Sequence, residues 1–390
     1  MDIPRNRSLL TNSLGHMFVD MFASITPVML AFLSVPMSLT NAQIALAASL
    51  FTFFSSLLQP AFGWLADRYG SRWLGAGGLL WLMVFMSLVM VAGERGTFSL
   101  VVILLCLAGV GSAAFHPQGV MNAANVEQGR QTTAVSMFFF FGNVGMTLGP
   151  ALTGLILTYS GPSSFPLLTV AGLPVAWLLA TSTHSAPQER KPDDISSSPS
   201  QSRAPLAFSV VAALTALVVL RSWATFTTIT FLPKFYQELG WGPASYGLVA
   251  SIWTMGSAVG NVLGGSAADR WGRRLVVSTS LGLIVPVLLF LPYARGTTPF
   301  VVSALGGLLC GLSFSIVVVL AQTLLPGGKG FASGITMGAM FASGAAGNIV
   351  SGWIADNFGL TRALQSLAFV ALAAALCAQV LPGTRPAAEQ

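Results

Sequence analysis

The feature that most restricts the fold of this chain is a series of continuous apolar runs, each roughly the 20 residues that an α-helix needs to cross a membrane. Strands of transmembrane β-barrels alternate apolar and polar residues instead. The composition agrees with helical spans, because 54% of the 390 residues are hydrophobic and only 8% are charged, against about 25% charged in soluble domains. Twelve runs are found, at residues 9–35, 42–66, 73–93, 98–122, 131–158, 164–182, 206–232, 244–268, 275–294, 298–325, 331–355 and 361–382. We therefore predict an all-α integral membrane protein with twelve transmembrane helices.

One long polar segment divides the runs into two sets of six. It is rich in Ser, Pro and charged residues, a composition typical of a flexible linker. We predict an N-terminal six-helix bundle at 1–182, a cytoplasmic linker at 183–205 and a C-terminal six-helix bundle at 206–390. Lys and Arg favour cytoplasmic loops, and most of the 18 Lys and Arg residues lie on one side if the amino terminus is cytoplasmic. This predicts a multi-pass protein of the cell (inner or plasma) membrane with both termini in the cytoplasm, and it explains the +6 net charge without nucleic-acid binding.

Two decapeptides repeat at an offset of 202 residues, GWLADRYGSR from Gly63 and GSAADRWGRR from Gly265. Alone, each fits a tight turn whose charges set the topology. Their matching places in two halves favour a transporter, because parallel six-helix repeats are a transporter architecture. The decapeptides resemble the loop signature of the major facilitator superfamily, with Ser71 and Ala267 as departures. The resemblance implies two six-helix bundles and a conformational charge lock on the cytoplasmic side, formed by Asp67, Arg68, Arg72, Asp269, Arg270, Arg273 and Arg274.

Four further segments resemble the fosmidomycin-resistance branch of that superfamily. They are SLGHMFVDMFASITP, GVGSAAFHPQG, LRSWATFTTITFLP and LAQTLLPGGKGFASGITMG, spread over both halves. The resemblance implies a drug exporter driven by proton influx. It leaves the substrate open.

Asp20 is the acidic residue that lies deep in an apolar run, whereas the others fall in loops, tails or run ends. An ionisable group within hydrocarbon is costly. His16 lies one turn earlier, so both side chains project from one face of the helix. Burial disfavours the charged carboxylate and a neighbouring cation favours it, which predicts a group able to load and release a proton. The alternative is a buried carboxylate that is hydrogen-bonded for structure alone.

Two more polar groups lie within the spans. His116, in AAFHP, lies near the depth of His16. It is a candidate for proton coupling and substrate binding, or it bonds backbone groups freed by Pro117. Arg221 is the basic residue within a run, and the 202-residue offset maps it onto Val19, next to Asp20. We predict that Arg221 faces Asp20 and binds the negative charge of a substrate; the alternative is a structural salt bridge.

The remaining candidates rest on weaker signals. Further substrate-binding candidates are Trp223, Trp253, Gln322 and Asn143. The segment GNVGMTLGPALTG predicts close helix packing at Gly145, Gly149 and Gly154 and a kink at Pro150. No cysteine or histidine spacing predicts a metal site, and we expect no cofactor.

These features predict a proton-coupled antiporter that exports a small anionic or zwitterionic compound by alternating access. The chain lacks the phosphate-binding motif GxxxxGK[ST], so ATP is not expected to drive it. An uptake symporter for an organic anion or metabolite is the alternative, and a membrane-embedded enzyme is a remote one. We expect the protein to work as a monomer, with the bilayer, protons and a small molecule as its partners.

Overall fold

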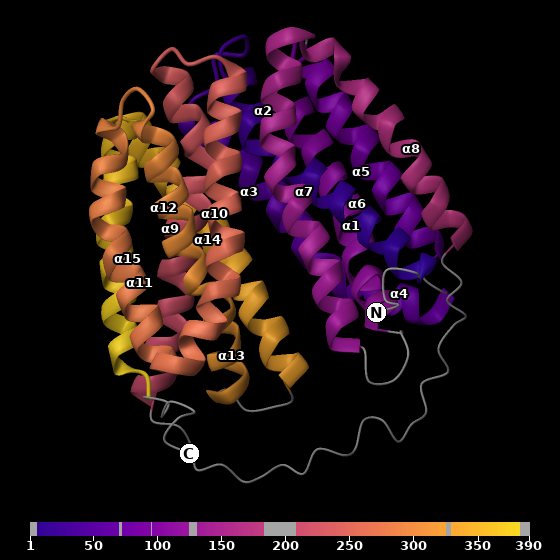
Figure 1. The fold of residues 1–390 in the computed structure, drawn as a ribbon. Coiled ribbons are helices and arrows are strands. Elements are labelled where there is room, and N and C mark those ends of the chain that lie inside the picture. Colours follow the sequence, from indigo (N-terminus) through magenta and orange to yellow (C-terminus); the bar gives the residue numbers. More distant parts are fainter. Residues whose placement is uncertain are drawn as a thin grey trace. The chain divides into compact units, whose positions relative to one another are not determined.

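The computed structural model describes residues 6–69, 72–94, 96–124, 131–182, 208–324 and 329–382, and their regular elements are all helices (Figure 1). In chain order these are α1 (Arg7–Ser24), α2 (Thr26–Leu33), α3 (Asn41–Leu57), α4 (Gln59–Tyr69), α5 (Arg72–Gly93), α6 (Phe98–Ala124), α7 (Gln131–Tyr159), the 3₁₀ helix η2 (Pro162–Ser164), α8 (Phe165–Ser182), α9 (Phe208–Glu238), α10 (Pro243–Trp271), α11 (Arg273–Phe290), the 3₁₀ helix η4 (Leu291–Tyr293), α12 (Thr298–Leu312), α13 (Phe314–Leu324), α14 (Lys329–Phe358) and α15 (Leu360–Val380).

Three of the predicted spans are each built from two consecutive helices. The first span changes from α1 to α2 at Ile25, and Pro27 lies at the start of α2. Proline has no N–H to donate and suits the first turn of a helix, so it ends the α1 hydrogen-bond ladder there. The second span changes from α3 to α4 at Leu58, just before Pro60. The tenth span changes from α12 to α13 at Ser313, where no proline lies.

The helices agree in number and place with the predicted spans. Eleven segments of the described residues are long and apolar enough to cross a membrane. The predicted span 331–355 lies within the 30-residue helix α14, which is not among those eleven. The predicted end of the seventh span at 232 is too early, because α9 continues to Glu238. This extension brings Lys234 into the helix, with 9% of the residue exposed.

The chain forms two compact units, described separately below. The first contains Met1–Glu189 and Tyr236–Ser251, and the second contains Arg190–Phe235 and Ile252–Gln390. The start of α10 belongs to the first unit because it bonds to α7. The Ala244 N–H donates to Thr158 Oγ1 at 2.9 Å, and the Ala151 N–H donates to Ser251 Oγ at 2.8 Å. The predicted linker lies outside the described residues, and the division at 1–182 and 206–390 stays a prediction.

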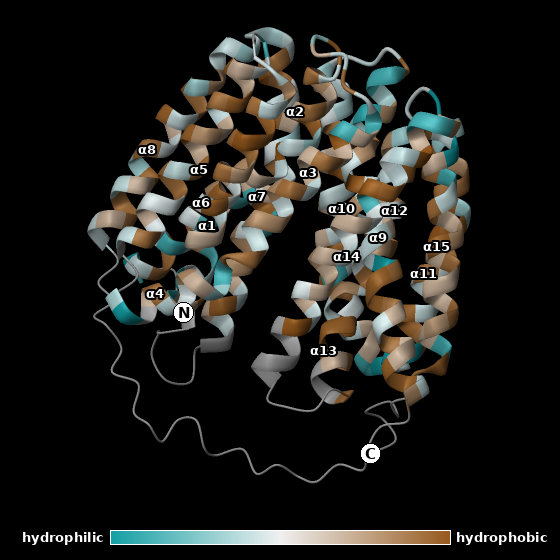
Figure 2. Cartoon of the chain, turned by 180° about the vertical axis from the view of Figure 1, so that it is seen from behind, coloured by the Kyte–Doolittle hydropathy of each residue, from teal (hydrophilic) through white to brown (hydrophobic). Residues whose placement is uncertain are grey.

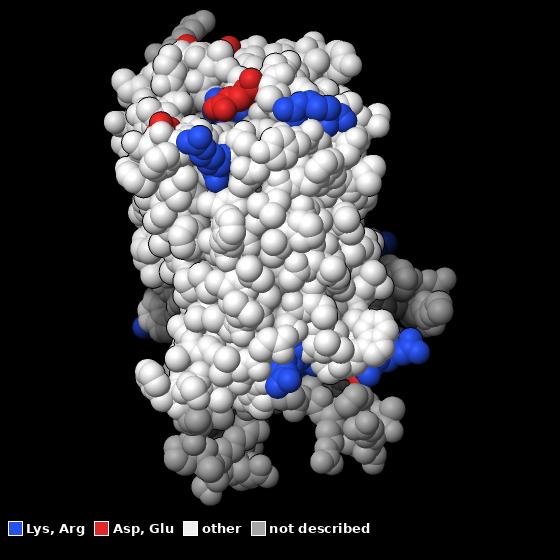
Figure 3. All heavy atoms as spheres, turned by 90° about the vertical axis from the view of Figure 1, so that its left-hand side faces the viewer, with Lys and Arg blue, Asp and Glu red and all other residues white. Residues whose placement is uncertain are grey.

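The surface has the polarity that lipid requires. In Figure 2 the hydrophilic residues gather near helix ends, and hydrophobic residues follow the helices between them. Figure 3 shows one face, the side of Figure 1 on which α11 and α15 lie, with a broad uncharged band between charged residues near its two ends. Large apolar side chains of these helices are exposed, among them Leu283, Phe369 and Leu376. Such a surface is stable against hydrocarbon rather than water.

Candidate proton and substrate sites

Asp20, His16 and His116 meet within the first unit. We call them the Asp20 cluster. Asp20 and His16 lie one turn apart on α1, and His116 comes from α6. His16 Nε2 lies 3.2 Å from Asp20 Oδ2, and His116 Nε2 lies 3.1 Å from Asp20 Oδ1. The exposed fractions of the side chains are 3% for His16, 14% for Asp20 and 23% for His116. One carboxylate therefore bridges two imidazole rings, each at a different oxygen.

The second nitrogen of each imidazole contacts a backbone carbonyl. His16 Nδ1 lies 2.9 Å from the Phe138 oxygen on α7, and His116 Nδ1 lies 2.8 Å from the Ser112 oxygen one turn earlier on α6. A carbonyl oxygen can only accept a hydrogen bond. Both Nδ1 atoms therefore carry a hydrogen and donate it, which fixes the ring orientations and turns both Nε2 atoms towards Asp20.

Helix α7 packs closely against the His16 side chain. The Phe138 ring stacks on the His16 ring with 3.9 Å between centroids and 8° between planes. Gly142 follows one turn later on α7, and a Cβ there would collide with the His16 ring and lie 2.6 Å from Asp20 Oδ2. Only glycine lets α7 come this close.

The spacing of the Asp20 cluster would also suit a divalent metal ion, since its ligand-type atoms lie within 4.8 Å of one another. Experiments on the cluster therefore need a chelator control.

Arg221 lies within the second unit, on α9, with 2% of the residue exposed. Its Nε–H donates to Ser313 Oγ at 2.8 Å, and Nη2–H donates to the Cys310 carbonyl at 3.2 Å. The guanidinium carbon lies 5.2 Å from the centre of the Phe314 ring. All three partners lie at the change from α12 to α13, and none of them carries a charge. The guanidinium therefore binds the carboxyl-terminal end of α12, where the carbonyl dipoles favour a cation.

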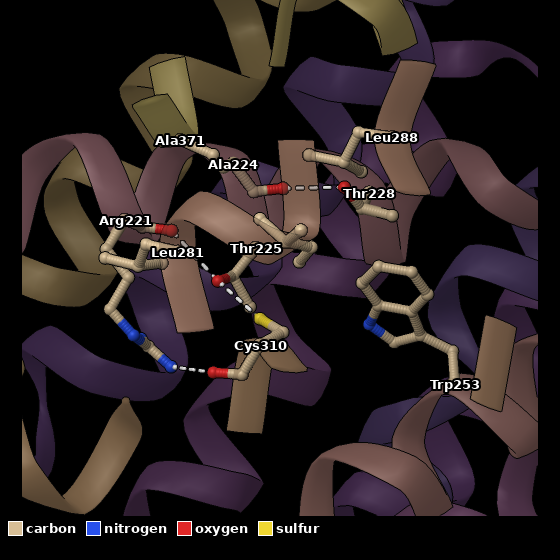
Figure 4. A pocket seen from close by; sticks show the side chains of 10 residues that line it. Arg221, Ala224, Thr225, Thr228, Trp253, Leu281, Leu288, Cys310 and Ala371 are labelled. Carbon is tan, nitrogen blue, oxygen red and sulfur yellow. Dashed lines mark hydrogen bonds between the residues drawn. The ribbon is translucent and has the colours of Figure 1, made fainter. Parts of the chain in front are cut away.

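A small cavity lies beside Arg221, and Figure 4 shows how its side chains converge. Its volume is about 10 Å³, room for about one water molecule. Arg221, Thr225, Trp253 and Cys310 are among its lining residues. Trp253 is buried, and its indole Nε1–H has no hydrogen-bond partner among the described residues. The cavity thus brings Arg221 and Trp253, two predicted substrate residues, to one place.

The comparisons with known proteins agree with this architecture. The sequence profile of the Major Facilitator Superfamily matches residues 13–233 and again residues 214–390. The chain belongs to the major facilitator superfamily. The prediction of an all-helical membrane transporter fold is thereby confirmed, and the remote alternative of an enzyme is excluded, since this is a family of transporters.

Two relatives of this superfamily member match nearly its whole length. The fosmidomycin resistance protein of Escherichia coli (strain K12) is 30% identical over 92% of this chain and 89% of its own. An uncharacterised transporter of the superfamily, YfnC of Bacillus subtilis (strain 168), is 32% identical over 93% of this chain and 90% of its own. The predicted resemblance to the fosmidomycin-resistance branch is confirmed by the first of these.

Solved structures match the fold. A bacterial homologue of the human lysosomal transporter Spinster, inward-facing and occupied, matches with a TM-score of 0.80 at 14% identity, over 96% of both chains. A D-xylose–proton symporter matches with a TM-score of 0.74 at 15% identity, over 97% of this chain and 98% of its own. At these identities the likeness concerns the fold alone.

The loop signatures of this superfamily member lie at helix ends. Arg68 is exposed near the end of α4, with its guanidinium carbon 5.4 Å from the centre of the Trp64 ring. The side chains of Asp67 and Arg72 lie outside the described residues. In the second copy, Asp269, Arg270 and Arg274 are exposed and Arg273 is half-buried, around the change from α10 to α11. The charge lock stays a prediction.

The glycine-rich segment of α7 faces α1. A side chain at Gly145 would collide with the Met17 carbonyl, and one at Gly149 with the Met21 carbonyl. Gly154 approaches the Pro243 carbonyl instead, and α7 continues through Pro150. Backbones in contact without intervening side chains are typical of packed membrane helices.

The other predicted substrate residues differ in their surroundings. The Trp223 indole N–H donates to Ser351 Oγ on α14 at 2.8 Å. Asn143 donates to the Phe139 carbonyl of its own helix at 3.0 Å, and the Gln322 side chain lies outside the described residues. Asp20 belongs to the first unit and Arg221 to the second, so their predicted pairing stays a prediction.

Sequence reasoning missed the residues that position the charged groups. Phe138 and Gly142 were not predicted as part of the proton site, nor Ser313 and Cys310 as partners of Arg221. One signal was available, because Phe138 and Gly142 are four residues apart and so share a helix face. No sequence signal marks the change from α12 to α13, which depends on tertiary packing.

Proposed function

We propose that this protein is a proton-coupled antiporter that exports a small anionic or zwitterionic compound by alternating access. The observation that carries the proposal is the Asp20 cluster, a carboxylate within the first span whose two side-chain partners are both imidazoles. Histidine is the side chain that most often serves as a proton carrier in proteins, which supports a role for this cluster in proton coupling. A carboxylate with a purely structural role needs hydrogen-bond donors, but those donors need not be titratable side chains. Similarity to the fosmidomycin resistance protein of E. coli supports export as the direction.

Arg221 is the proposed site for the negative charge of the substrate. A guanidinium can hold a carboxylate or phosphonate through two parallel hydrogen bonds. Its partners at the end of α12 are neutral, so an anion would compete with them for the guanidinium. Asp20, His116, Trp223, Trp253, Gln322 and Asn143 are further candidates for contact with substrate. We also infer that both termini are cytoplasmic, in the inner membrane, and that the monomer is the working unit.

The direction of transport can be tested in proteoliposomes with an imposed pH gradient. A ligand for the assay comes from a thermal-shift screen over phosphonates, organic acids and antibiotics, because a ligand of the folded state raises its melting temperature. An antiporter moves that ligand towards the acidic side while protons flow the other way. Movement away from the acidic side would identify the uptake symporter instead. Flux that is insensitive to the gradient would contradict both.

A further inference from the structure

Three side chains with the chemistry of metal ligands meet in the Asp20 cluster. Imidazole nitrogens and a carboxylate oxygen suit Zn²⁺ and related transition-metal ions, and the ligand-type atoms of His16, Asp20 and His116 lie within 4.8 Å of one another. The two separations between an imidazole nitrogen and a carboxylate oxygen are 3.2 and 3.1 Å. Around a tetrahedral ion with bonds of about 2.0–2.2 Å, neighbouring ligand atoms lie roughly 3.3–3.6 Å apart. Small shifts of these side chains would therefore let them surround one ion.

The outer contacts of both imidazoles match those of metal-binding histidines. His16 Nδ1–H donates to the Phe138 carbonyl at 2.9 Å, and His116 Nδ1–H donates to the Ser112 carbonyl at 2.8 Å. A histidine that binds a metal ion almost always donates its other ring N–H in this way, which fixes the tautomer and the orientation of the ring. In both rings Nε2 is then the nitrogen available to an ion, and both Nε2 atoms lie next to the Asp20 carboxylate.

The surroundings of the cluster are closed on one side and accessible on the other. The His16 side chain is 3% exposed and stacks on the Phe138 ring, whereas the His116 side chain is 23% exposed. An ion can therefore enter past His116. Three protein ligands with a fourth position left to water or a small molecule are the arrangement of an open zinc site.

We propose that the Asp20 cluster binds one divalent transition-metal ion, represented here by Zn²⁺, through His16 Nε2, His116 Nε2 and the Asp20 carboxylate. Mg²⁺ and Ca²⁺ prefer sites made of oxygen ligands, so a site with two imidazoles should reject them. The bound ion would join α1 to α6. Spacing along one helix could not predict this site, because His116 lies 96 residues from Asp20. The inference goes beyond the proposed proton coupling and does not depend on it, although the ion and the coupling proton would use the same atoms.

Other possible ligands can be separated from the cluster by experiment. Within the described parts of the chain, it is the one group of three His, Cys, Asp or Glu side chains whose ligand atoms are close enough for an ion. His184 lies outside the described residues, so the test uses a His184→Gln protein. The three cysteines are free, and a cysteine sulfur binds Zn²⁺ at about 2.3 Å, whereas an imidazole nitrogen binds it at about 2.0–2.1 Å. X-ray absorption at the zinc edge distinguishes these two distances.

The test measures Zn²⁺ binding by the full-length His184→Gln chain in lipid bilayers, after removal of any purification tag and treatment with a chelator. Calorimetry should show one Zn²⁺ ion per chain and no comparable binding of Mg²⁺, and the bound ion should raise the melting temperature. Loss of a group that only supports a metal ligand lowers affinity about 10- to 100-fold, so losing a ligand itself should lower it further. The variants that test this are Asp20→Asn, His16→Gln and His116→Gln, each checked for folding by thermal unfolding without Zn²⁺. Asp356→Asn, at an exposed carboxylate outside the cluster, should bind like the parent.

X-ray absorption of the Zn²⁺ complex gives a result that needs no variant of the cluster. We expect nitrogen and oxygen ligands at about 2.0–2.2 Å, with the outer scattering of two imidazole rings. Three results would overturn the proposal: no binding of Zn²⁺ by the parent, parental affinity in the three cluster variants, or a sulfur ligand at about 2.3 Å.

Transport assays keep this inference apart from the proposed function. Because the bound ion would occupy atoms that proton coupling needs, Zn²⁺ at concentrations that fill the site should inhibit gradient-driven flux. Undiminished flux with the site filled would contradict proton coupling at Asp20 and leave the metal site supported. An absence of Zn²⁺ binding would remove the metal site and leave the proposed proton coupling unaffected.

Discussion

The Asp20 cluster and the Arg221 site differ in what surrounds a buried charge. Asp20 lies in the first span of the first half, and the 202-residue repeat maps Arg221, in the first span of the second half, one residue away from it. Asp20 is held by two imidazoles that can change charge. Arg221 is held by a hydroxyl, a carbonyl and an aromatic face, which cannot. Equivalent places in the repeat thus carry one charge whose side-chain partners are two imidazoles and one charge whose partners are neutral groups.

From this difference we infer separate roles for the two residues, proton coupling at Asp20 and substrate binding at Arg221. A guanidinium stays protonated in proteins, so the proposed substrate site at Arg221 would present the same charge at every physiological pH. Its neutral partners can be exchanged for an anion without moving a proton. At Asp20, by contrast, any change in the neighbouring charges changes proton binding. The comparison predicts that substitutions at Asp20 act on coupling, and that substitutions at Arg221 act on affinity.

The largest effect is expected for Asp20→Asn. The amide keeps the shape of the carboxyl group but cannot ionise, so proton-driven accumulation should be lost while the protein still folds. The measurement is flux into vesicles with an imposed pH gradient, with thermal unfolding as the folding check. Asp356→Asn, at an exposed carboxylate near the end of α14, is the matched control and should transport like the parent. Parental accumulation in Asp20→Asn would show that Asp20 does not carry the coupling proton.

Arg221→Ala should weaken the binding of an anionic substrate by roughly 10- to 100-fold, because a hydrogen bond to a charged group contributes about 1.5–3 kcal/mol. Arg221→Lys keeps the charge but cannot form two parallel hydrogen bonds to one anion. Its affinity for the anion should therefore fall between those of the parent and the alanine variant. Calorimetry at several pH values measures both. If Arg221→Ala bound the anion with parental affinity, Arg221 would be a structural residue that holds the end of α12.

Gly142→Ala tests whether the close approach of α7 maintains the Asp20 cluster. The added methyl group would collide with the His16 ring and crowd Asp20 Oδ2, and overpacking of this kind costs about 1–3 kcal/mol. We expect a lower melting temperature and impaired coupling. Gly77→Ala is the matched control, since a Cβ at Gly77 on α5 meets nothing within 4 Å and alanine favours a helix by about 0.5–1 kcal/mol. A stability order opposite to this would contradict the packing role of Gly142.

The same two regions show how far sequence reasoning can reach. The His16–Asp20 pair was predictable because both residues lie on one helix, where a spacing of four fixes their contact. The contact with His116 was not, since it depends on how α6 packs against α1. The four phenylalanines at 138–141 illustrate this limit, because the sequence does not indicate which of them faces inward. Phe138 is fully buried against His16, whereas Phe140 is 63% exposed. Likewise, the buried charge of Arg221 was evident, but its partners depend on a helix change that the sequence does not mark.

The smallest effect is expected at the loop signatures, where the two halves can be compared directly. If Asp67 stabilises closure of the cytoplasmic side by contact with an arginine or a helix amino terminus, Asp67→Asn should favour the inward-facing state. A charge at a helix end contributes about 0.3–1 kcal/mol when exposed and up to about 2 kcal/mol when partly buried. The population should therefore shift by a few-fold to about 30-fold.

Distances between spin labels on the cytoplasmic ends of the helices measure this shift, and the same labels in Asp269→Asn measure it for the second half. Because Asp269 is exposed, its substitution should give only the lower end of that range. Unchanged distances in Asp67→Asn would show that Asp67 does not stabilise closure of the cytoplasmic side. An equal shift in both variants would show that the two halves contribute equally to the charge lock.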